Sequence, residues 1–208
     1  MTNEPTRTAE EARLAILDAA ASAFLDQGFA HTTIDDIAAR VGATKGLIYY
    51  HYRSKFDIFL AVYTHGMHAV HDAIATVADR DGTGAVRLTA MVRAHIGYLL
   101  SHIAIHHTIN QGVHLRTTIA LKPRQAQALA DLNTLRDAFE QLFRDVIVDG
   151  VADGSIVDAD PGLLTRTLLS SVSAIDQWFR PRADQTDSDL AALADQITEI
   201  LLGGLRNR

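Results

Sequence analysis

Residues 42–55 have the sequence GATKGLIYYHYRSK, which gathers three tyrosines, one histidine and three cations in one short segment. Aromatic residues at helical spacing usually belong to a hydrophobic core, but cations and hydroxyl groups stand among them here. This mixture favours a surface that contacts a polyanion. The elements around the segment decide whether its polar groups reach such a surface together.

Capping patterns divide the chain around this segment into short helices. Thr33 followed by Asp36 resembles a capping box with Asp in place of Glu, and it predicts a helix that Gly42 ends. Thr44 has the side chain to cap the next helix, which runs to about Tyr52. Two short helices joined by a turn that contains glycine indicate a helix-turn-helix.

The second helix of such a pair enters the major groove of DNA with its N-terminal residues against base edges. Ile37 and Ala38 on the first helix and Ile48 on the second supply the packed faces, so the start of the second helix stays free. Its unpaired amide groups suit phosphate, and Gly46 lets the backbone come close to DNA. The segment therefore predicts a DNA reader.

Charge supports this prediction only locally. The chain has 19 Lys and Arg residues against 25 Asp and Glu residues, and this net charge of −6 argues mildly against a nucleic-acid binder. Residues 40–56, however, contain no acid and four cations: Arg40, Lys45, Arg53 and Lys55. Because salt screens remote charges, this segment can still attract DNA, with an affinity that depends strongly on salt.

The spaced pattern TIDDIA, G, TKG, IY, HY and SK within residues 33–55 resembles the DNA-binding domain of TetR-type transcriptional regulators, a likeness that covers about residues 10–58. It implies a homodimeric repressor with a helix-turn-helix DNA-binding domain over residues 1–58. Residues 59–208 are then the helical ligand-binding and dimerisation domain. Tyr52 stands where phenylalanine is commoner in the family, a change that is neutral for the core.

The resemblance also assigns roles to residues of the segment. In the family, phosphates are contacted by the residues that match Thr33, Tyr49, Tyr50, His51 and Lys55. Bases are approached by the residues that match Thr44, Lys45, Gly46 and Leu47. Arg53 stands where proline is common and adds a cation for a phosphate.

Some of these aromatic and basic residues have a purely structural alternative. A core role is favoured for Tyr52, and for Tyr49 core and contact roles are about equally supported. The alternative for Lys55 is a solvated side chain in the first turn of the helix that Ser54 caps. A cation there opposes the helix dipole, so a phosphate partner explains Lys55 better.

Helical periodicity continues along the chain without an alternating strand pattern, which predicts an all-α fold of about nine helices. The first three helices form the DNA-binding domain. The expected helices span about residues 12–28, 34–41, 44–52, 55–78, 85–102, 103–118, 122–150, 161–179 and 190–205. The helix over residues 55–78 is expected to be the only continuous element between the reader and the larger domain.

Apolar stripes with small residues at the crossings mark the last two helices as a dimer interface, in keeping with the family. The expected interface residues are Leu168, Val172, Ile175, Phe179, Leu193, Ile197, Ile200 and Leu201.

The segments GVADGSIVDADPG (150–162) and WFRP (178–181) look similar to those of TetR-type repressors that respond to acyl-CoA thioesters. The effector is therefore expected to be a small apolar molecule, with an acyl-CoA thioester as the sharpest hypothesis. The expected pocket residues are Met91, His95, Leu99, His102, His106, Phe143 and Trp178, although packing is the commoner role for the tryptophan. Cations for the CoA phosphates would come from Arg116, Lys122, Arg124, Arg180 and Arg182, for each of which a solvated loop position is the alternative.

Other functions remain as alternatives. The pairs His65/His68 and His102/His106 could each share a helix face, which leaves a metal-responsive regulator open beside a drug-efflux regulator. Without cysteine, no structural zinc site and no cofactor are expected. A small helical enzyme or an interaction module would leave residues 42–55 unexplained, and no Gly-x-Ser-x-Gly or phosphate-binding glycine loop is present, so an enzyme is not expected.

The composition also sets the expected location and partners. No apolar run is long enough to span a bilayer, and the N-terminal MTNEPTRTAEEARLA lacks a signal core. The absence of cysteine is compatible with a reducing compartment. The chain is expected in the cytoplasm, with double-stranded operator DNA, a second copy of itself and a small-molecule effector as partners.

Overall fold

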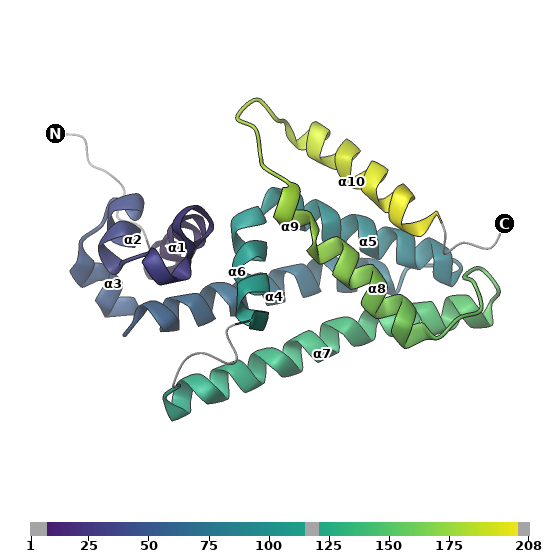
Figure 1. The fold of residues 1–208 in the computed structure, drawn as a ribbon, viewed down its shortest axis with the longest axis horizontal. Coiled ribbons are helices and arrows are strands. Elements are labelled where there is room, and N and C mark those ends of the chain that lie inside the picture. Colours follow the sequence, from purple (N-terminus) through teal and green to yellow (C-terminus); the bar gives the residue numbers. More distant parts are fainter. Residues whose placement is uncertain (1–7, 115–120, 204–208) are drawn as a thin grey trace. The chain divides into compact units, whose positions relative to one another are not determined.

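The structure is a computed structural model of the 208-residue chain, and it describes residues 8–114 and 121–203. Its regular elements are α-helices, which confirms the predicted all-α fold (Figure 1). They are α1 (Ala9–His31), α2 (Ile34–Val41), α3 (Lys45–His51), α4 (Lys55–Ala78), α5 (Gly84–Ser101), α6 (Ile103–His114), α7 (Pro123–Ala152), α8 (Pro161–Ser173), α9 (Ile175–Trp178) and α10 (Asp187–Leu202).

The caps predicted around the helix-turn-helix are confirmed. The Asp36 carboxylate accepts hydrogen bonds from the backbone N–H (2.8 Å) and the hydroxyl (2.7 Å) of Thr33, whose own oxygen accepts from the Asp36 amide. Gly42 ends α2 in the left-handed conformation, with φ +69° and ψ +34°, which glycine adopts without steric cost. Thr44 and Ser54 cap α3 and α4, since their hydroxyl oxygens accept the amides three residues on.

The end of α1 differs from the prediction. Gly28 breaks the helix with φ +76° and ψ +153°, but one more turn follows it, up to His31. The buried Thr32 holds this turn in place, because its hydroxyl lies 2.8 Å from the carbonyl oxygen of Gly28 and 3.1 Å from that of Ala23.

The predicted helix over residues 161–179 is two helices, α8 and α9, with a break at Ala174. Near the end of α8, the Ser171 hydroxyl donates to the Thr167 carbonyl oxygen at 2.9 Å, a bond that tends to bend helices. The last helix, α10, begins at a capping box made by Thr186 and Asp189. The residues expected to extend α6 to 118 and the last helix to 205 lie outside the described ranges.

Contacts within the chain define two compact units. The N-terminal unit comprises residues 1–66 and 104–129, and the C-terminal unit comprises residues 67–103 and 130–208. The domain boundary at residues 58 and 59 stays a prediction. Both α4 and α7 contribute residues to each unit. The expectation that the helix over residues 55–78 is the only continuous connection between the reader and the larger domain stays a prediction.

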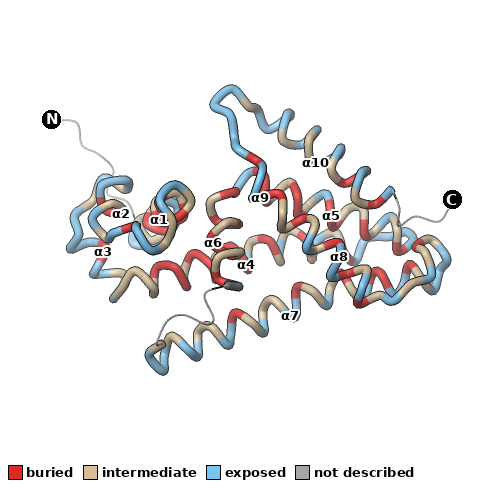
Figure 2. The backbone as a smooth tube through the Cα atoms, viewed as in Figure 1, coloured by how far each residue is buried: buried red, intermediate tan, exposed pale blue. Residues whose placement is uncertain are grey.

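The core of the N-terminal unit is built on α1. Ile16, Leu17 and Phe24 of this helix are fully buried, and Figure 2 shows buried segments of α1 in red. One buried isoleucine each from α2 and α3 joins them, Ile37 and Ile48. These apolar anchors fix the helix-turn-helix through its inner side.

The core of the C-terminal unit is built on α5, which packs against α10. Leu88, Met91, Val92, Ile96 and Leu99 of α5 have an exposed fraction of 1% or less. On α10 the buried side chains are Ala194, Thr198 and Leu202. Since these three residues recur at four-residue steps, they form one face of α10 and leave its other faces outside this core.

The first turn of α5 is held by the segment that follows α7. The Asp153 carboxylate accepts a hydrogen bond from the Gly84 amide (2.7 Å), and the Ser155 hydroxyl accepts one from the Ala85 amide (3.0 Å). Gly84 lies against the backbone of Gly150, where a Cβ atom would have no space. Part of the segment GVADGSIVDADPG therefore has a structural role, as a cap supplied from far along the chain.

No single described helix is long and apolar enough to cross a membrane. Only together do α5 and the start of α6, which meet at a bend of 102°, have the length and composition of a membrane span.

Candidate nucleic-acid interface

The helix α3 is anchored by one residue and exposed elsewhere. Ile48 is fully buried, whereas Leu47, Tyr49 and Tyr50 are 38%, 49% and 81% exposed. Thr44, Lys45 and Gly46 at its start are exposed as well, and Figure 2 shows the pale blue of this surface. These six exposed residues present backbone, hydroxyl, apolar and cationic groups side by side, which suits contact with base edges and phosphates.

The tyrosines and the histidine of this segment have different settings. The ring of Tyr50 lies edge-on to that of His51, with centroids 5.1 Å apart, and His51 is half-buried. The exposure of Tyr49 favours its contact role over a core role. Tyr52 lies on the core side with a buried hydroxyl, and this burial raises its pKa against the opposing effect of Arg13.

Two predicted contributors are already engaged within the protein. The Thr33 hydroxyl donates to Asp36 as part of the α2 cap, although the residue is exposed. The Lys45 ammonium lies 2.8 Å from the Asp35 carboxylate, and this ion pair raises the pKa of the lysine. Lys45 therefore has to exchange a carboxylate for a DNA group when it binds.

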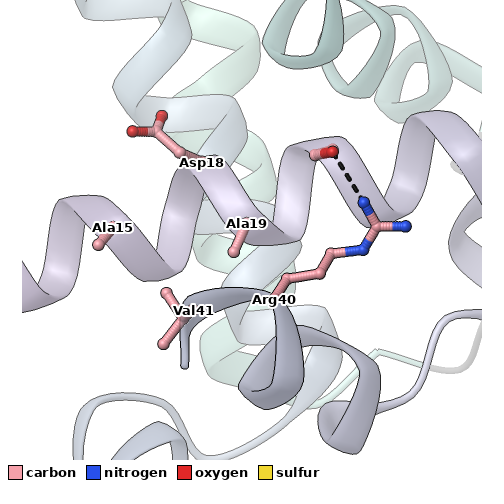
Figure 3. Close-up of a pocket in the computed structure, with 6 residues that line it drawn as sticks. Ala15, Asp18, Ala19, Arg40 and Val41 are labelled. Atoms are coloured by element: carbon pink, nitrogen blue, oxygen red, sulfur yellow. Dashed lines mark hydrogen bonds between the residues drawn. The ribbon is translucent and has the colours of Figure 1, made fainter. Parts of the chain in front are cut away.

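Of the remaining cations of residues 40–56, Arg40 is engaged within the protein, whereas Arg53 is exposed. Arg40 pairs with Asp26 at 2.8 Å and donates to the Ser22 hydroxyl at 3.0 Å, across a shallow depression between α1 and α2 (Figure 3). Arg53 is exposed and has no ion pair or hydrogen bond to the described residues. The local positive charge is thus smaller than the count of cations suggested.

Lys55, too, is engaged within the protein. The sequence favoured a phosphate partner for its ammonium, but in the structure Nζ donates to the backbone carbonyl oxygens of Phe29 (2.5 Å), Ala30 (3.1 Å) and Thr32 (2.7 Å). An ammonium has three N–H donors, and these three acceptors use all of them. The physical reason is that the final turn of α1 leaves its carbonyl groups without helical partners.

The predicted effector residues are only partly brought together. Met91, His95 and Leu99 share one buried face of α5, and the His95 ring lies 6.1 Å from that of Phe143 on α7. His106 is buried too, but it belongs to the N-terminal unit.

Two of the predicted pocket residues lie on the surface instead. His102 is the exposed residue that ends α5, where its ring stacks on Tyr98 with centroids 4.4 Å apart. Trp178 is 57% exposed. Neither side chain lines an enclosed apolar pocket in this structure, and the cause is that α5 and α9 end at these positions.

The cations expected near the CoA phosphates are scattered. Arg180 donates to the carbonyl oxygens of Asp176 (3.0 Å) and Phe179 (2.7 Å), so it acts as a cap for α9. Lys122 and Arg124 are exposed, and Arg182 lies 3.4 Å from Asp184. Arg116 lies outside the described residues. Within the described ranges, no cluster of three acidic or histidine residues could hold a metal ion.

The expected dimer interface also needs correction. Leu168, Val172, Ile175 and Phe179 are at most 5% exposed within a single chain, so they have no surface to offer a partner. Their stripe faces the core because α8 and α9 bury that side. On α10, Ile200 is 77% exposed, and Leu193, Ile197 and Leu201 are half-buried.

The sequence did not reveal Asp35 as the partner of Lys45, nor Asp153 and Ser155 as the cap of α5. No local spacing marks either arrangement, since the bonded residues lie in different elements.

Two parts of the chain match known protein families. Residues 16–62 match "Bacterial regulatory proteins, tetR family", and residues 81–205 match "Tetracyclin repressor-like, C-terminal domain".

The chain belongs to the TetR family. It is accordingly a ligand-responsive, DNA-binding transcriptional regulator with a helix-turn-helix, and the family is not enzymatic. The recognition made from residues 33–55 is thereby confirmed.

Relatives of full length point to the same family. The chain is 29% identical over 198 residues to the HTH-type transcriptional repressor KstR2 of Rhodococcus jostii (strain RHA1), which covers 93% of this chain and 90% of the relative. The structure of the ketosteroid transcriptional regulator KstR2 of Mycobacterium tuberculosis has a TM-score of 0.80 at 22% identity and covers 97% and 98% of the two chains. AibR, solved in complex with isovaleryl coenzyme A and operator DNA, has a TM-score of 0.72 at 22% identity and covers 91% and 97%.

Proposed function

We propose that the chain is a homodimeric repressor that reads operator DNA with α3 and leaves the DNA when an acyl-CoA thioester binds. Residues 1–58 are the proposed reader, and residues 59–208 bind the effector and the second subunit. The exposed residues of α3 and the exposed cation Arg53 support the DNA contacts. Thr33, Thr44, Gly46 and His51 lie on the same short pair of helices and belong to the proposed contact set.

The observation that carries the effector class is the likeness to AibR, whose structure contains isovaleryl coenzyme A and operator DNA. KstR2 is described as a ketosteroid transcriptional regulator, and ketosteroids are largely apolar molecules. Both favour an effector with a large apolar part over a metal ion or a small polar metabolite.

The chain's own residues fit such an effector. The buried face formed by Met91, His95 and Leu99, with Phe143 beside it, offers apolar contacts and one imidazole within them. A thioester carbonyl can accept a hydrogen bond from an imidazole N–H, and the acyl chain can replace apolar side-chain contacts. Because this face is packed, the effector has to bind a rearranged conformation, which is how it can disfavour the DNA-bound form.

The proposed second subunit would bind through residues that one chain leaves exposed. Besides Ile200, these are Leu163 of α8 (61% exposed) and Trp178 of α9 (57% exposed). Large apolar side chains at these exposures are typical of surfaces that contact another protein. The half-buried residues of α10, Leu193, Ile197 and Leu201, complete the proposed interface.

Calorimetry tests the effector class. The titrants are isovaleryl-CoA, longer acyl-CoA thioesters, the matching free acids, a lipophilic cation and zinc, each with and without bound duplex DNA. We expect the thioesters alone to bind, with an affinity that the DNA lowers by about 5- to 150-fold, the usual range of coupling between two sites. Binding of the cation alone would indicate a drug-efflux regulator, and binding of zinc alone a metal-responsive one.

A pair of histidine variants locates the effector. His95→Phe keeps a ring in the buried face but removes its N–H, and we expect about tenfold weaker thioester binding with unchanged DNA affinity. His102→Phe is the matched control at the exposed end of α5 and should bind like the wild type. An equal loss of thioester affinity in both variants, or no loss in either, would contradict the proposed site.

A further inference from the structure

Lys55 is the first residue of α4, and its ammonium is surrounded by the end of α1. Its three hydrogen bonds go to Phe29, Ala30 and Thr32, and two of these bonds are partly buried. Nζ also lies 4.6 Å from the centroid of the Phe29 ring, a distance at which a cation is attracted to an aromatic face. Removal from water lowers the pKa of this lysine.

The acceptors converge because of the backbone in this region. Gly28 interrupts α1, and the following turn ends at His31 with its carbonyl groups unpaired within the helix. The Thr32 hydroxyl fixes the turn from the other side through its contacts with Ala23 and Gly28. The lysine thus satisfies carbonyl groups of this helix end other than those that the Thr32 hydroxyl bonds.

Aromatic packing joins the same two elements. The Phe29 ring contacts Phe56 and Phe59 of α4, with centroids 6.2 and 5.1 Å apart, and Phe24 of α1, at 5.4 Å. Lys55 and these rings therefore form one contact between α1 and the start of α4, entirely within the N-terminal unit. Its polar part is the ammonium and its apolar part is the ring cluster.

We propose that Lys55 is a positioning residue for DNA binding, which fixes the reader helices on α4 and makes no phosphate contact. To reach a phosphate, the ammonium would have to leave three carbonyl oxygens at a partly buried helix end unsatisfied, which is costly. By holding α1 against α4, the residue sets the direction in which α4 leaves the reader. In a dimer this direction fixes the separation of the two reading helices, and half-site spacing tolerates little change.

The inference rests on the proposed function, in which a dimer reads DNA through α3. Its test uses the full chain and a duplex that the wild type selects from a random-sequence library. Four variants are compared: Lys55→Met, Lys55→Arg, Phe29→Leu and Arg53→Ala. The last is the matched control, because it removes an exposed cation two residues away that has no partner among the described residues.

The dependence of affinity on salt separates positioning from phosphate contact. Removing one phosphate contact lowers the slope of log affinity against log salt by about one unit. We expect this decrease for Arg53→Ala but not for Lys55→Met, which should instead bind about tenfold more weakly at every salt concentration. Lys55→Arg should bind weakly as well, since a planar guanidinium does not match three converging carbonyls, whereas a phosphate contact would tolerate arginine.

Operator spacing provides a readout that a loss of stability alone would not change. The wild type should lose affinity steeply when one base pair is inserted between the half-sites. In Lys55→Met this loss of affinity on insertion should be smaller. It should also be smaller in Phe29→Leu, which removes no charge. The variants are measured well below their melting temperatures. If Lys55→Met does not fold, the spacing penalty of Phe29→Leu tests the inference in its place.

Two results would overturn the inference. One is a slope reduced by about one unit in Lys55→Met together with full binding by Lys55→Arg, which would restore the phosphate role. The other is an unchanged affinity and spacing penalty in both Lys55→Met and Phe29→Leu. Failure of the proposed function is distinct, because the wild type would then select no duplex at all.

Discussion

Asp35 and Lys45 form an ion pair at the start of the reading helix, and it shows how single side chains set this surface. The two groups are 2.8 Å apart and both are at least half exposed, so the pair contributes little to stability. Its effect is to hold the cation and to keep a negative charge beside the DNA-facing side. The carboxylate of neighbouring Asp36 points to the start of α2 instead, where it accepts a hydrogen bond from the Thr33 amide as part of the cap.

The Asp35→Ala variant tests this role. Without the carboxylate, Lys45 is free and the reader is more positive, so affinity for any duplex should rise while discrimination between selected and scrambled duplexes falls. Fluorescence anisotropy with both duplexes measures the two quantities. Asp26→Ala is the control, because it removes the same charge from the partner of Arg40. Discrimination that is unchanged in Asp35→Ala would refute the role.

At the scale of elements, the sequence predicted what local physics determines and missed what depends on distant partners. The caps by Thr33, Thr44 and Ser54 join each hydroxyl oxygen to the backbone amide three residues on, which donates to it, so spacing alone identifies them. The cap of α5 could not be predicted, because Asp153 lies 69 residues from Gly84. The burial of the stripe through Leu168 was missed for a similar reason, since periodicity shows that a helix has an apolar face but not what covers it.

The cap of α5 makes a prediction about pH. Hydrogen bonds that the Asp153 carboxylate accepts from Ser155 and from the Gly84 amide hold its pKa below the ordinary value. The stabilising effect of the carboxylate is therefore present above about pH 3.9 and fades as the pH falls toward the lowered pKa. Asp153→Ala should melt at a lower temperature than the wild type at pH 7, and the difference should narrow below about pH 4. Thermal melts of both proteins at pH 7 and below about pH 4 measure this difference in melting temperature. A difference that does not depend on pH would contradict the carboxylate's role.

The close approach of α5 and α7 makes a second prediction at this scale. A Cβ atom at Gly84 would meet the backbone of Gly150, which cannot move aside as a flexible side chain can. Gly84→Ala should therefore cost about 1–3 kcal/mol of unfolding free energy. Gly97→Ala on the same helix is the control, since open space surrounds that position. Urea denaturation that gives equal stabilities for the two variants would refute the close approach.

At the scale of the whole molecule, the exposed apolar residues support the proposal that this chain functions with a partner copy. The reader pattern was recognisable because it combines local caps with a fixed order of polar and aromatic residues. The exposure of the residues expected at the proposed dimer interface was only partly predictable. Ile200 is exposed, as an interface requires, whereas Leu168 and Val172 are core residues. A charge at those two positions would unfold the chain before it dissociated a dimer.

The Ile200→Glu variant tests the dimer. A charge on this 77% exposed residue should leave the melting temperature of the chain's core largely unchanged, yet produce monomers at micromolar concentration and abolish operator binding. Val148→Glu is the matched control, an exposed apolar residue of α7 (46%). Light scattering measures the mass of each. A dimer that persists in Ile200→Glu, or a wild type that is itself a monomer, would contradict the proposed assembly.

The central claim is that this chain binds DNA through α3. The most direct measurement is the affinity of the wild type, of Lys45→Ala/Tyr50→Ala and of Arg182→Ala for a duplex that the wild type selects from a random library. Arg182→Ala makes the same change of charge in the segment between α9 and α10, far along the chain from α3. We predict that the α3 variant loses about 1–3 kcal/mol or more of binding free energy while Arg182→Ala binds as the wild type does. Full binding by a folded Lys45→Ala/Tyr50→Ala protein would contradict the claim.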